Sequence, residues 1–181
     1  LLLCTGLGWS EPSPRLVVPV PHAQPISALQ ESPDGRFLAT GDLSGSLKIW
    51  DTSTRQLQQS LSSQRGGFYP FWLGWLGLER VLCYGNDFRF HLFDVASGQR
   101  LSSQPEKAFR TRGGVAQVGA QVLFSPLQPG PPLLQQWDPV AWKQQASWAI
   151  PEAQADDAVD SLCVNAQGNR VCLGLQSGRA L

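Results

Sequence analysis

The sequence lacks an excess of charge of either sign. In a chain of 181 residues, 14 Lys and Arg side chains balance 14 Asp and Glu side chains. Because no global field attracts such a chain to nucleic acid or to an anionic membrane surface, we do not expect nucleic-acid binding. Only 15% of the residues are charged, whereas there are 18 Gly, 14 Pro and 7 Trp residues. This composition favours turns and strands over long exposed helices, so it predicts an all-β protein.

Paired cysteines are also missing. Cys4, Cys83, Cys163 and Cys172 include no C-x-x-C pair, which removes the usual signatures of a zinc ribbon or a dithiol redox centre. Cys163 and Cys172 could face each other on neighbouring strands, but buried free thiols are favoured over a disulfide in a chain of this size. Free thiols indicate a reducing compartment, so we expect a cytoplasmic protein.

Long apolar runs are absent as well. The apolar stretch LLLCTGLGW at residues 1–9 is shorter than the ~20 residues of a membrane span, and it has neither a basic leader nor a small-residue cleavage site. We therefore expect no membrane insertion. Since the sequence starts without Met and stops within an apolar pattern, we expect it to be a fragment of a larger protein.

What the sequence does contain is a hairpin pattern in SPDGRFLATGDLSGSLKIWD, residues 32–51. Pro33, Asp34 and Gly35 favour a turn. Residues 37–40 then predict a short buried strand, residues 41–45 a polar turn, and residues 46–50 a strand with two distinct faces. The hairpin ends on the bulky pair Trp50-Asp51.

The aromatic-Asp pair returns at near-constant spacing, as Phe93-Asp94 and Trp137-Asp138. The intervals are 43 residues from Trp50 to Phe93 and 44 from Phe93 to Trp137, within the ~40–45 residues of a four-stranded propeller blade. We predict three complete units at residues 22–63, 64–104 and 105–150, with partial units at 1–21 and 151–181. The strands expected in the complete units are 26–30, 36–40, 46–50, 57–61, 71–76, 80–84, 89–94, 100–103, 114–118, 121–125, 133–137 and 145–148, and those in the last are 161–165 and 171–175.

These units resemble the WD40-repeat β-propeller family. The resemblance implies a buried hydrogen-bond network that fixes each blade, made of a His before the first strand, a hydroxyl on the second, a turn Asp and a terminal Trp-Asp. In the first unit the turn Asp is replaced by Ser44; in the second no His precedes the first strand, and Phe93 replaces Trp. The residues assigned to the network are His22, Thr40, Trp50, Asp51, Asp87, Asp94, Trp137 and Asp138.

A catalytic interpretation of His22, Thr40 and Trp50 is weaker than the structural one. Both His residues lack an adjacent nucleophile or carboxylate in the sequence, and His91 is expected to be an ordinary strand residue. There is no Gly-rich phosphate loop, and no carboxylates or metal ligands cluster at a recognisable spacing. We therefore expect no enzyme activity, no cofactor and no metal.

A propeller closes with typically 4 to 8 blades, so these units predict a piece of a larger ring. The stretch FYPFWLGWLGLERVLCYG at residues 68–85 resembles the N-terminal propeller of the neuroblastoma-amplified sequence family. That resemblance implies a subunit of a Golgi-to-endoplasmic-reticulum vesicle tether, at the cytosolic face of the endoplasmic reticulum, with peripheral membrane association through a complex.

Two segments are candidates for partner binding. Trp72 belongs to an aromatic run that would anchor an interface if exposed, although its alternation favours an inner strand packed between blades. Arg110 and Arg112 lie in a basic connector that could hold an acidic peptide, although a solvated loop is favoured. The sequence as a whole predicts a non-catalytic scaffold or adaptor that binds other proteins within a multisubunit complex.

Overall fold

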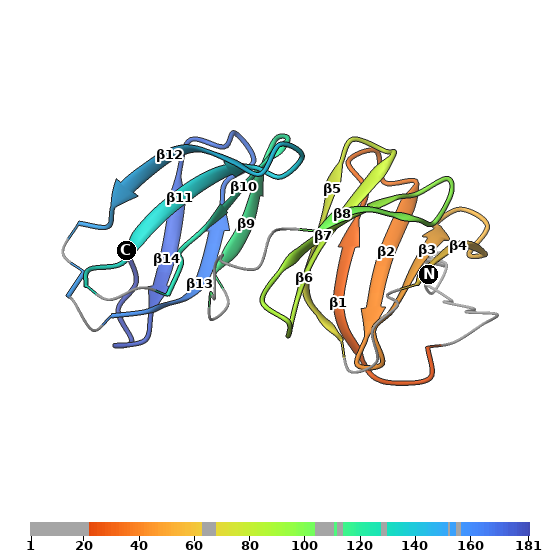
Figure 1. Ribbon diagram of the computed structural model, residues 1–181, viewed down its shortest axis with the longest axis horizontal. Helices are drawn as coiled ribbons and strands as arrows, with labels where there is room; N and C mark the ends of the chain where they lie inside the picture. The colour runs from red at the N-terminus through yellow and green to blue at the C-terminus, as the bar shows by residue number, and fades with distance from the viewer. Residues whose placement is uncertain are drawn as a thin grey trace, which may run out of the picture.

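Four antiparallel sheets follow one another along the chain (Figure 1). The computed structural model describes residues 22–62, 68–103, 111, 114–127, 130–151, 153–154 and 157–181. In these residues, three sheets have four strands and the last has two, so the expected all-β fold with three complete blades and a partial one is confirmed. The partial unit expected at residues 1–21 lies outside the described residues.

Within each sheet, every strand pairs with the strand that follows it in sequence. The first blade contains β1 (Ile26–Glu31), β2 (Phe37–Asp42), β3 (Ser46–Asp51) and β4 (Leu57–Ser62). The second contains β5 (Pro70–Leu76), β6 (Arg80–Gly85), β7 (Phe90–Asp94) and β8 (Arg100–Ser103). The third contains β9 (Val115–Val118), β10 (Gln121–Phe124), β11 (Leu133–Asp138) and β12 (Lys143–Ala149), and the fourth begins with β13 (Val159–Val164) and β14 (Val171–Leu175).

The three aromatic residues at the ends of the third strands occupy equivalent positions. Each is paired with a residue of the second strand of its blade: Trp50 with Leu38, Phe93 with Val81 and Trp137 with Val122. In every complete blade the pairing with the fourth strand shifts register immediately before this aromatic residue. The same local irregularity at the same place shows that the three blades are copies of one structural unit.

The Asp that follows each aromatic residue closes the next turn. The Oδ1 atoms of Asp51, Asp94 and Asp138 accept backbone N–H bonds from residues two or three positions later, at 2.7–2.9 Å for Asp51 and 2.8 Å for Asp94. Four residues after each Asp, the chain enters the left-handed region, at Arg55, Gly98 and Trp142 (φ 60°, 70° and 52°). Hydrogen bonds from the Ser53 hydroxyl and then from the backbone N–H of Thr54 lower the pKa of Asp51 to about 2. The role of the terminal Asp is thus to fix a turn.

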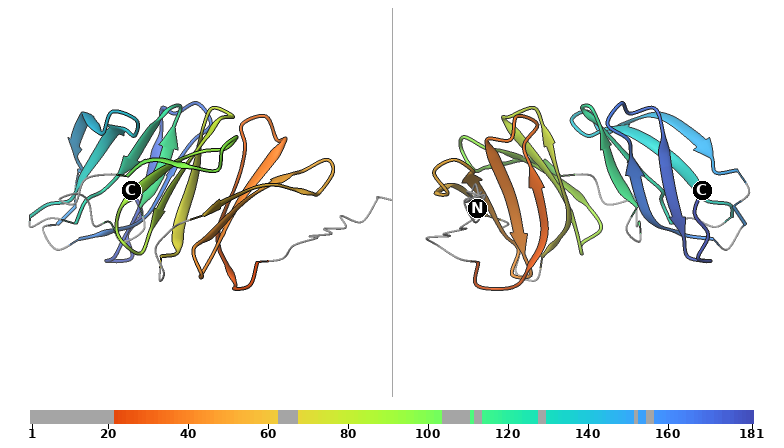
Figure 2. Two further views of the ribbon diagram at one scale, coloured as in Figure 1. Left: turned by 45° about the vertical axis from the view of Figure 1, so that its right-hand side comes forward. Right: turned by 180° about the vertical axis from the view of Figure 1, so that it is seen from behind.

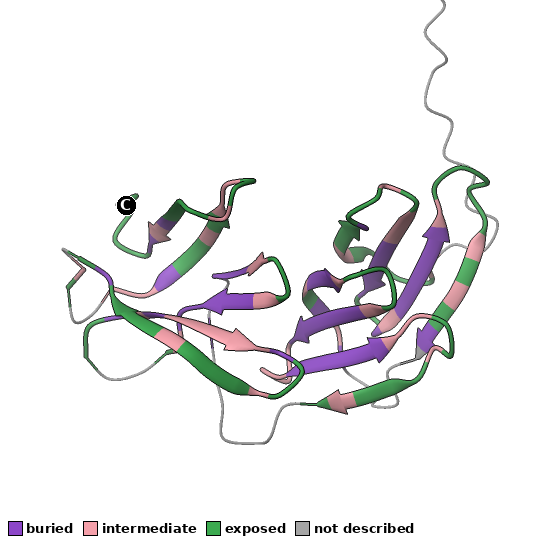
Figure 3. Cartoon of the chain, turned by 90° about the horizontal axis from the view of Figure 1, so that it is seen from above, coloured by how far each residue is buried: buried purple, intermediate pink, exposed green. Residues whose placement is uncertain are grey.

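The sheets pack face to face along an arc (Figure 2). In the first two blades, buried residues are concentrated on the second and third strands (Figure 3). The first strands lie nearest one another, β1 against β5, β5 against β9 and β9 against β13. Trp75 on β5 connects three blades, because its Nε1 donates to the carbonyl of Gln30 at 3.0 Å and its backbone N–H donates to Oε1 of Gln117 at 3.0 Å. The blades therefore share hydrogen bonds as well as apolar cores.

Candidate functional site: a buried blade network and the clefts between blades

Four side chains of the first blade form one hydrogen-bonded chain. Trp50 Nε1 donates to Thr40 Oγ1 at 2.7 Å, and Thr40 Oγ1 lies 2.7 Å from His22 Nε2. His22 Nδ1 lies 2.8 Å from Oδ2 of Asp42. With the imidazole proton on Nδ1, the hydroxyl donates to Nε2 and every contact pairs a donor with an acceptor. The network joins the segment before β1 to β2 and β3.

The order carboxylate, imidazole and hydroxyl has the form of a nucleophilic triad, and the sequence interpretation that His22 has no carboxylate partner was wrong. Asp42 is the partner, 20 residues away in sequence. Burial argues against nucleophilic catalysis, however, since the side chains of His22 and Asp42 are 4% and 0% exposed and Thr40 is 4% exposed. The hydroxyl of Thr40 is also occupied by Trp50. The arrangement is a structural tie between strands.

Asp42 is the turn Asp of this blade, so the expectation that Ser44 replaces it was also wrong. Its Oδ1 accepts bonds from the Ser44 hydroxyl (2.6 Å), from the Ser44 N–H (2.9 Å) and from the Ser46 N–H (3.0 Å). Burial by itself raises the pKa of Asp42, but the hydrogen bonds from Ser44, His22 and the backbone lower it below the ordinary value. The sequence did carry a signal, because an Asp two residues before Ser44 can form an Asx turn.

The lowered pKa of Asp42 predicts acid sensitivity. A carboxyl whose pKa is depressed by folding stabilises the protein above its unfolded pKa, and that contribution is lost as the pH falls through the folded pKa. We expect the free energy of unfolding to fall between about pH 5 and pH 2, and Asp42→Asn to be less stable at neutral pH with a shallower dependence over this range. Urea unfolding at several pH values measures both slopes. Asp160→Asn, at an exposed strand position, is the control; an Asp42→Asn slope equal to that of the control would contradict the assignment.

The second blade replaces this network with apolar packing. By strand register, Cys83 takes the place of Thr40, Gly85 that of Asp42, and Phe93 that of Trp50. Cys83 and Phe93 are both buried in the core with Phe68. An ideal Cβ on Gly85 would overlap the ring of Phe68. Replacing all members together avoids leaving a buried polar group unpaired.

Asp87 and His91 form a separate pair in the second blade. Asp87 lies in the turn between β6 and β7 and accepts the backbone N–H of Arg89 at 3.2 Å. His91, on β7, lies with Nε2 2.8 Å from Oδ2 of Asp87, and its buried Nδ1 has no hydrogen-bond partner. Burial raises the pKa of Asp87, but the contacts with His91 and Arg89 lower it more. Contrary to the sequence interpretation, His91 thus has a carboxylate partner.

The third blade keeps only part of the pattern. Trp137 Nε1 donates to Oε1 of Gln135 on its own strand at 3.0 Å. The register position of Thr40 is taken by Phe124, whose ring centroid lies 6.3 Å from that of Trp137. The network residues assigned from the sequence therefore meet in one place only in the first blade. Asp51, Asp94 and Asp138 instead end the third strands and bond the turns that follow.

Of the candidate partner-binding residues, only Trp72 is among the described residues. Trp72 is half-buried and packs edge to face on Phe90, 6.3 Å between ring centroids, in the core between the second and third blades. The structure thus places Trp72 against the core, the alternative that alternation along the strand favoured, and its role in partner binding stays a prediction. Arg110 and Arg112 lie outside the described residues. Among the residues that are described, no three His, Cys, Asp or Glu side chains are grouped to hold a metal, and no helix is long and apolar enough to span a bilayer.

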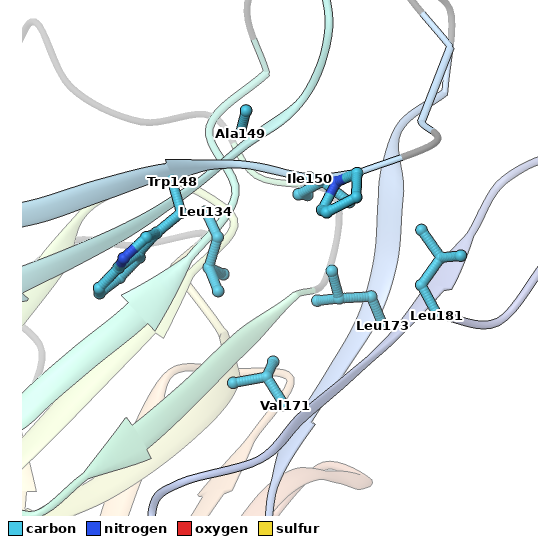
Figure 4. A pocket seen from close by; sticks show the side chains of 8 residues that line it. Leu134, Trp148, Ala149, Ile150, Val171, Leu173 and Leu181 are labelled. Carbon is cyan, nitrogen blue, oxygen red and sulfur yellow. The ribbon is translucent and has the colours of Figure 1, made fainter.

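Two of the clefts that the described residues line open at the surface between blades. One, of about 490 Å³, lies between the turns of the second and third blades and mixes charged with apolar side chains; it is lined by Leu76, Gly77, Glu79, Arg80, Ala120, Gln121, Asp138 and Val140. The other, of about 420 Å³, lies between the third and fourth blades and is apolar (Figure 4). It is lined by Leu134, Trp148, Ala149, Ile150, Pro151, Val171, Leu173 and Leu181. We define the first as the turn cleft.

Comparisons with known proteins match one segment of the chain to a family. Residues 14–51 match the family model described as WD domain, G-beta repeat. The 66 kDa stress protein of Physarum polycephalum is 50% identical over 40 residues, 22% of this chain and 6% of that protein. The COMPASS component SWD1 of Saccharomyces cerevisiae is 29% identical over 105 residues, 49% of this chain and 24% of that protein. The chain thus spans a quarter or less of the length of these curated relatives.

Solved structures have the same fold. The computationally designed Ika4 protein superposes with a TM-score of 0.65 at 19% identity, over 93% of this chain and 96% of that one. The β-propeller domain of Cps50 (Swd1) from Myceliophteria thermophila superposes with a TM-score of 0.62 at 19% identity, over 88% of this chain and 51% of that one. These matches do not support the resemblance to the neuroblastoma-amplified sequence family. Together with the repeated blades, they show a WD40-like β-propeller fold, in which residues 14–51 match a WD repeat.

Proposed function

We propose that the chain is a non-catalytic scaffold that holds protein partners within a multisubunit assembly. The observation that carries the proposal is that the strands are used to build the core, through a polar network in the first blade and apolar packing in the others. This leaves turns and the clefts between blades for binding. The similarity to a COMPASS component supports membership of a complex. A cytoplasmic location, as cysteine usage suggests, is part of the same proposal.

The turn cleft is the proposed docking site. Glu79, Arg80 and Asp138 supply charges of both signs, while Leu76 and Val140 supply apolar surface. Val140 is half exposed and stands at the rim, in the turn that Asp138 fixes. A site of this kind suits an extended peptide that carries an apolar anchor flanked by charged residues.

Val140→Glu tests this proposal. A charge at the rim should weaken binding of the stoichiometric partner at least about tenfold, because an apolar contact in an interface is replaced by a desolvated carboxylate. Ala96→Glu is the matched control, since Ala96 is exposed, occupies the same turn position in the second blade and does not line the cleft. Affinity purification followed by size-exclusion chromatography measures the complex. Equal recovery with both variants would exclude the cleft, and a chain that always elutes alone would count against the scaffold itself.

A further inference from the structure

The fourth blade carries two thiols directly opposite each other. Cys163 on β13 is the register partner of Cys172 on β14, and both cysteines are free. The expectation that these thiols are buried in the core was wrong, because both residues are exposed. The alternative that they face each other on neighbouring strands is confirmed.

The two side chains share one face of the hairpin, because register partners on antiparallel strands point the same way. The neighbouring hydrogen bonds show whether this is a hydrogen-bonded or a non-hydrogen-bonded antiparallel pair. Asn165 donates its backbone N–H to Arg170 O at 3.1 Å, and Leu173 donates its own to Leu181, away from β13. By alternation, Cys163 and Cys172 form a hydrogen-bonded pair, in which Cα atoms lie about 5.5 Å apart.

That spacing permits a bridge, but a strained one. Disulfides span Cα separations of about 4.4–6.8 Å, yet their Cβ atoms must come closer than in an unbridged pair of this type. A bridge here would need a small approach of the two strands. Strained and exposed disulfides are the readily reduced ones, so closure would be reversible.

We propose that Cys163 and Cys172 form a dithiol modification site for low-molecular-weight disulfides, the class that includes glutathione disulfide. The thiolate of one cysteine attacks the small disulfide, forming a mixed disulfide and releasing one small thiolate. The thiolate of the second cysteine then attacks the Sγ atom of the first cysteine in the mixed disulfide and releases the second small thiolate. Two protein thiols are oxidised to one disulfide, the small disulfide is reduced to two thiols, and the two protons leave with the released thiols.

Cys83 provides an internal control. It is 0% exposed in the core between the first and second blades, and burial raises the pKa of its thiol well above the ordinary value. Since the thiolate is the attacking species and must be reached by the reagent, Cys83 should not react while the protein is folded. Cys4 lies outside the described residues, so the test uses a Cys4→Ser background.

The test incubates the folded Cys4→Ser protein with mixtures of glutathione disulfide and glutathione, followed by intact mass measurement and peptide mapping. We expect a loss of two hydrogen atoms, a Cys163–Cys172 linked peptide, full reversal by excess glutathione and an unmodified Cys83. Cys163→Ser and Cys172→Ser should each instead gain one glutathione and no bridge. Stable double glutathione adducts without a bridge would overturn the proposal, as would two thiols that fail to react.

Discussion

Thr40→Val should destabilise the protein by about 3 kcal/mol, because two buried groups lose their partner at once. Trp50 Nε1 donates to the hydroxyl at 2.7 Å, and His22 Nε2 lies at the same distance from it. Valine has nearly the shape of threonine, so the loss comes from unpaired polar groups rather than from a cavity. Urea unfolding monitored by tryptophan fluorescence gives the difference in free energy.

The second blade supplies the control for this prediction. Thr40→Cys combined with Trp50→Phe reproduces the pair Cys83 and Phe93 in the first blade. We expect the double variant to lose at least about 1 kcal/mol less than the sum of the two single variants, because removing both partners leaves less polar surface unpaired. Strict additivity would mean that the hydroxyl and the indole do not depend on each other, contrary to the geometry.

Gly85→Ala should be the second large effect, destabilising by about 3 kcal/mol through overpacking. A Cβ at this position would stand 2.5 Å from the carbonyl oxygen of Tyr69 and would overlap Phe68. That carbonyl is held by the backbone N–H of Asn86 at 3.0 Å, so it cannot move away without breaking a hydrogen bond. Urea unfolding reports the loss, and hydrogen exchange should show faster opening of β5 and β6 than in the unmodified protein.

Gly174→Ala is the matched substitution for Gly85→Ala. Gly174 is also within a second strand, but the atom that its Cβ would meet first is the hydroxyl of Ser161, which can rotate away. We expect a change within about 0.5 kcal/mol. If the two glycines respond alike, the rigid carbonyl of Tyr69 does not set the cost at Gly85.

Strand positions were predictable from the sequence because turn chemistry is local. The strands at residues 100–103 and 171–175 have the predicted bounds, and most others differ by one or two residues. Aromatic-Asp pairs identify the end of a third strand because the Asp bonds the backbone of the turn directly after it. No long-range information is needed for such a signal.

The long-range contacts were not predictable in the same way. The pairing of His22 with Asp42 depends on how the segment before β1 folds back over β2. The sequence marks Asp42 as a residue that can form an Asx turn, but it does not identify the imidazole that Asp42 binds. The exposure of Cys163 and Cys172 depends on which face of the last hairpin meets a neighbour. Alternation assigns residues to two faces but does not say which face is covered.

The turn that follows each third strand has a consequence for how such a chain can change. Asp51, Asp94 and Asp138 fix the turns by hydrogen bonds made outside the core. The backbone of each turn is therefore determined by other residues than those that pack in the core. The core of one blade can therefore change from a hydrogen-bonded network to apolar packing while the fold of the blade is preserved. A design that places a new binding surface on these blades should keep that Asp, whereas the core side chains can be substituted.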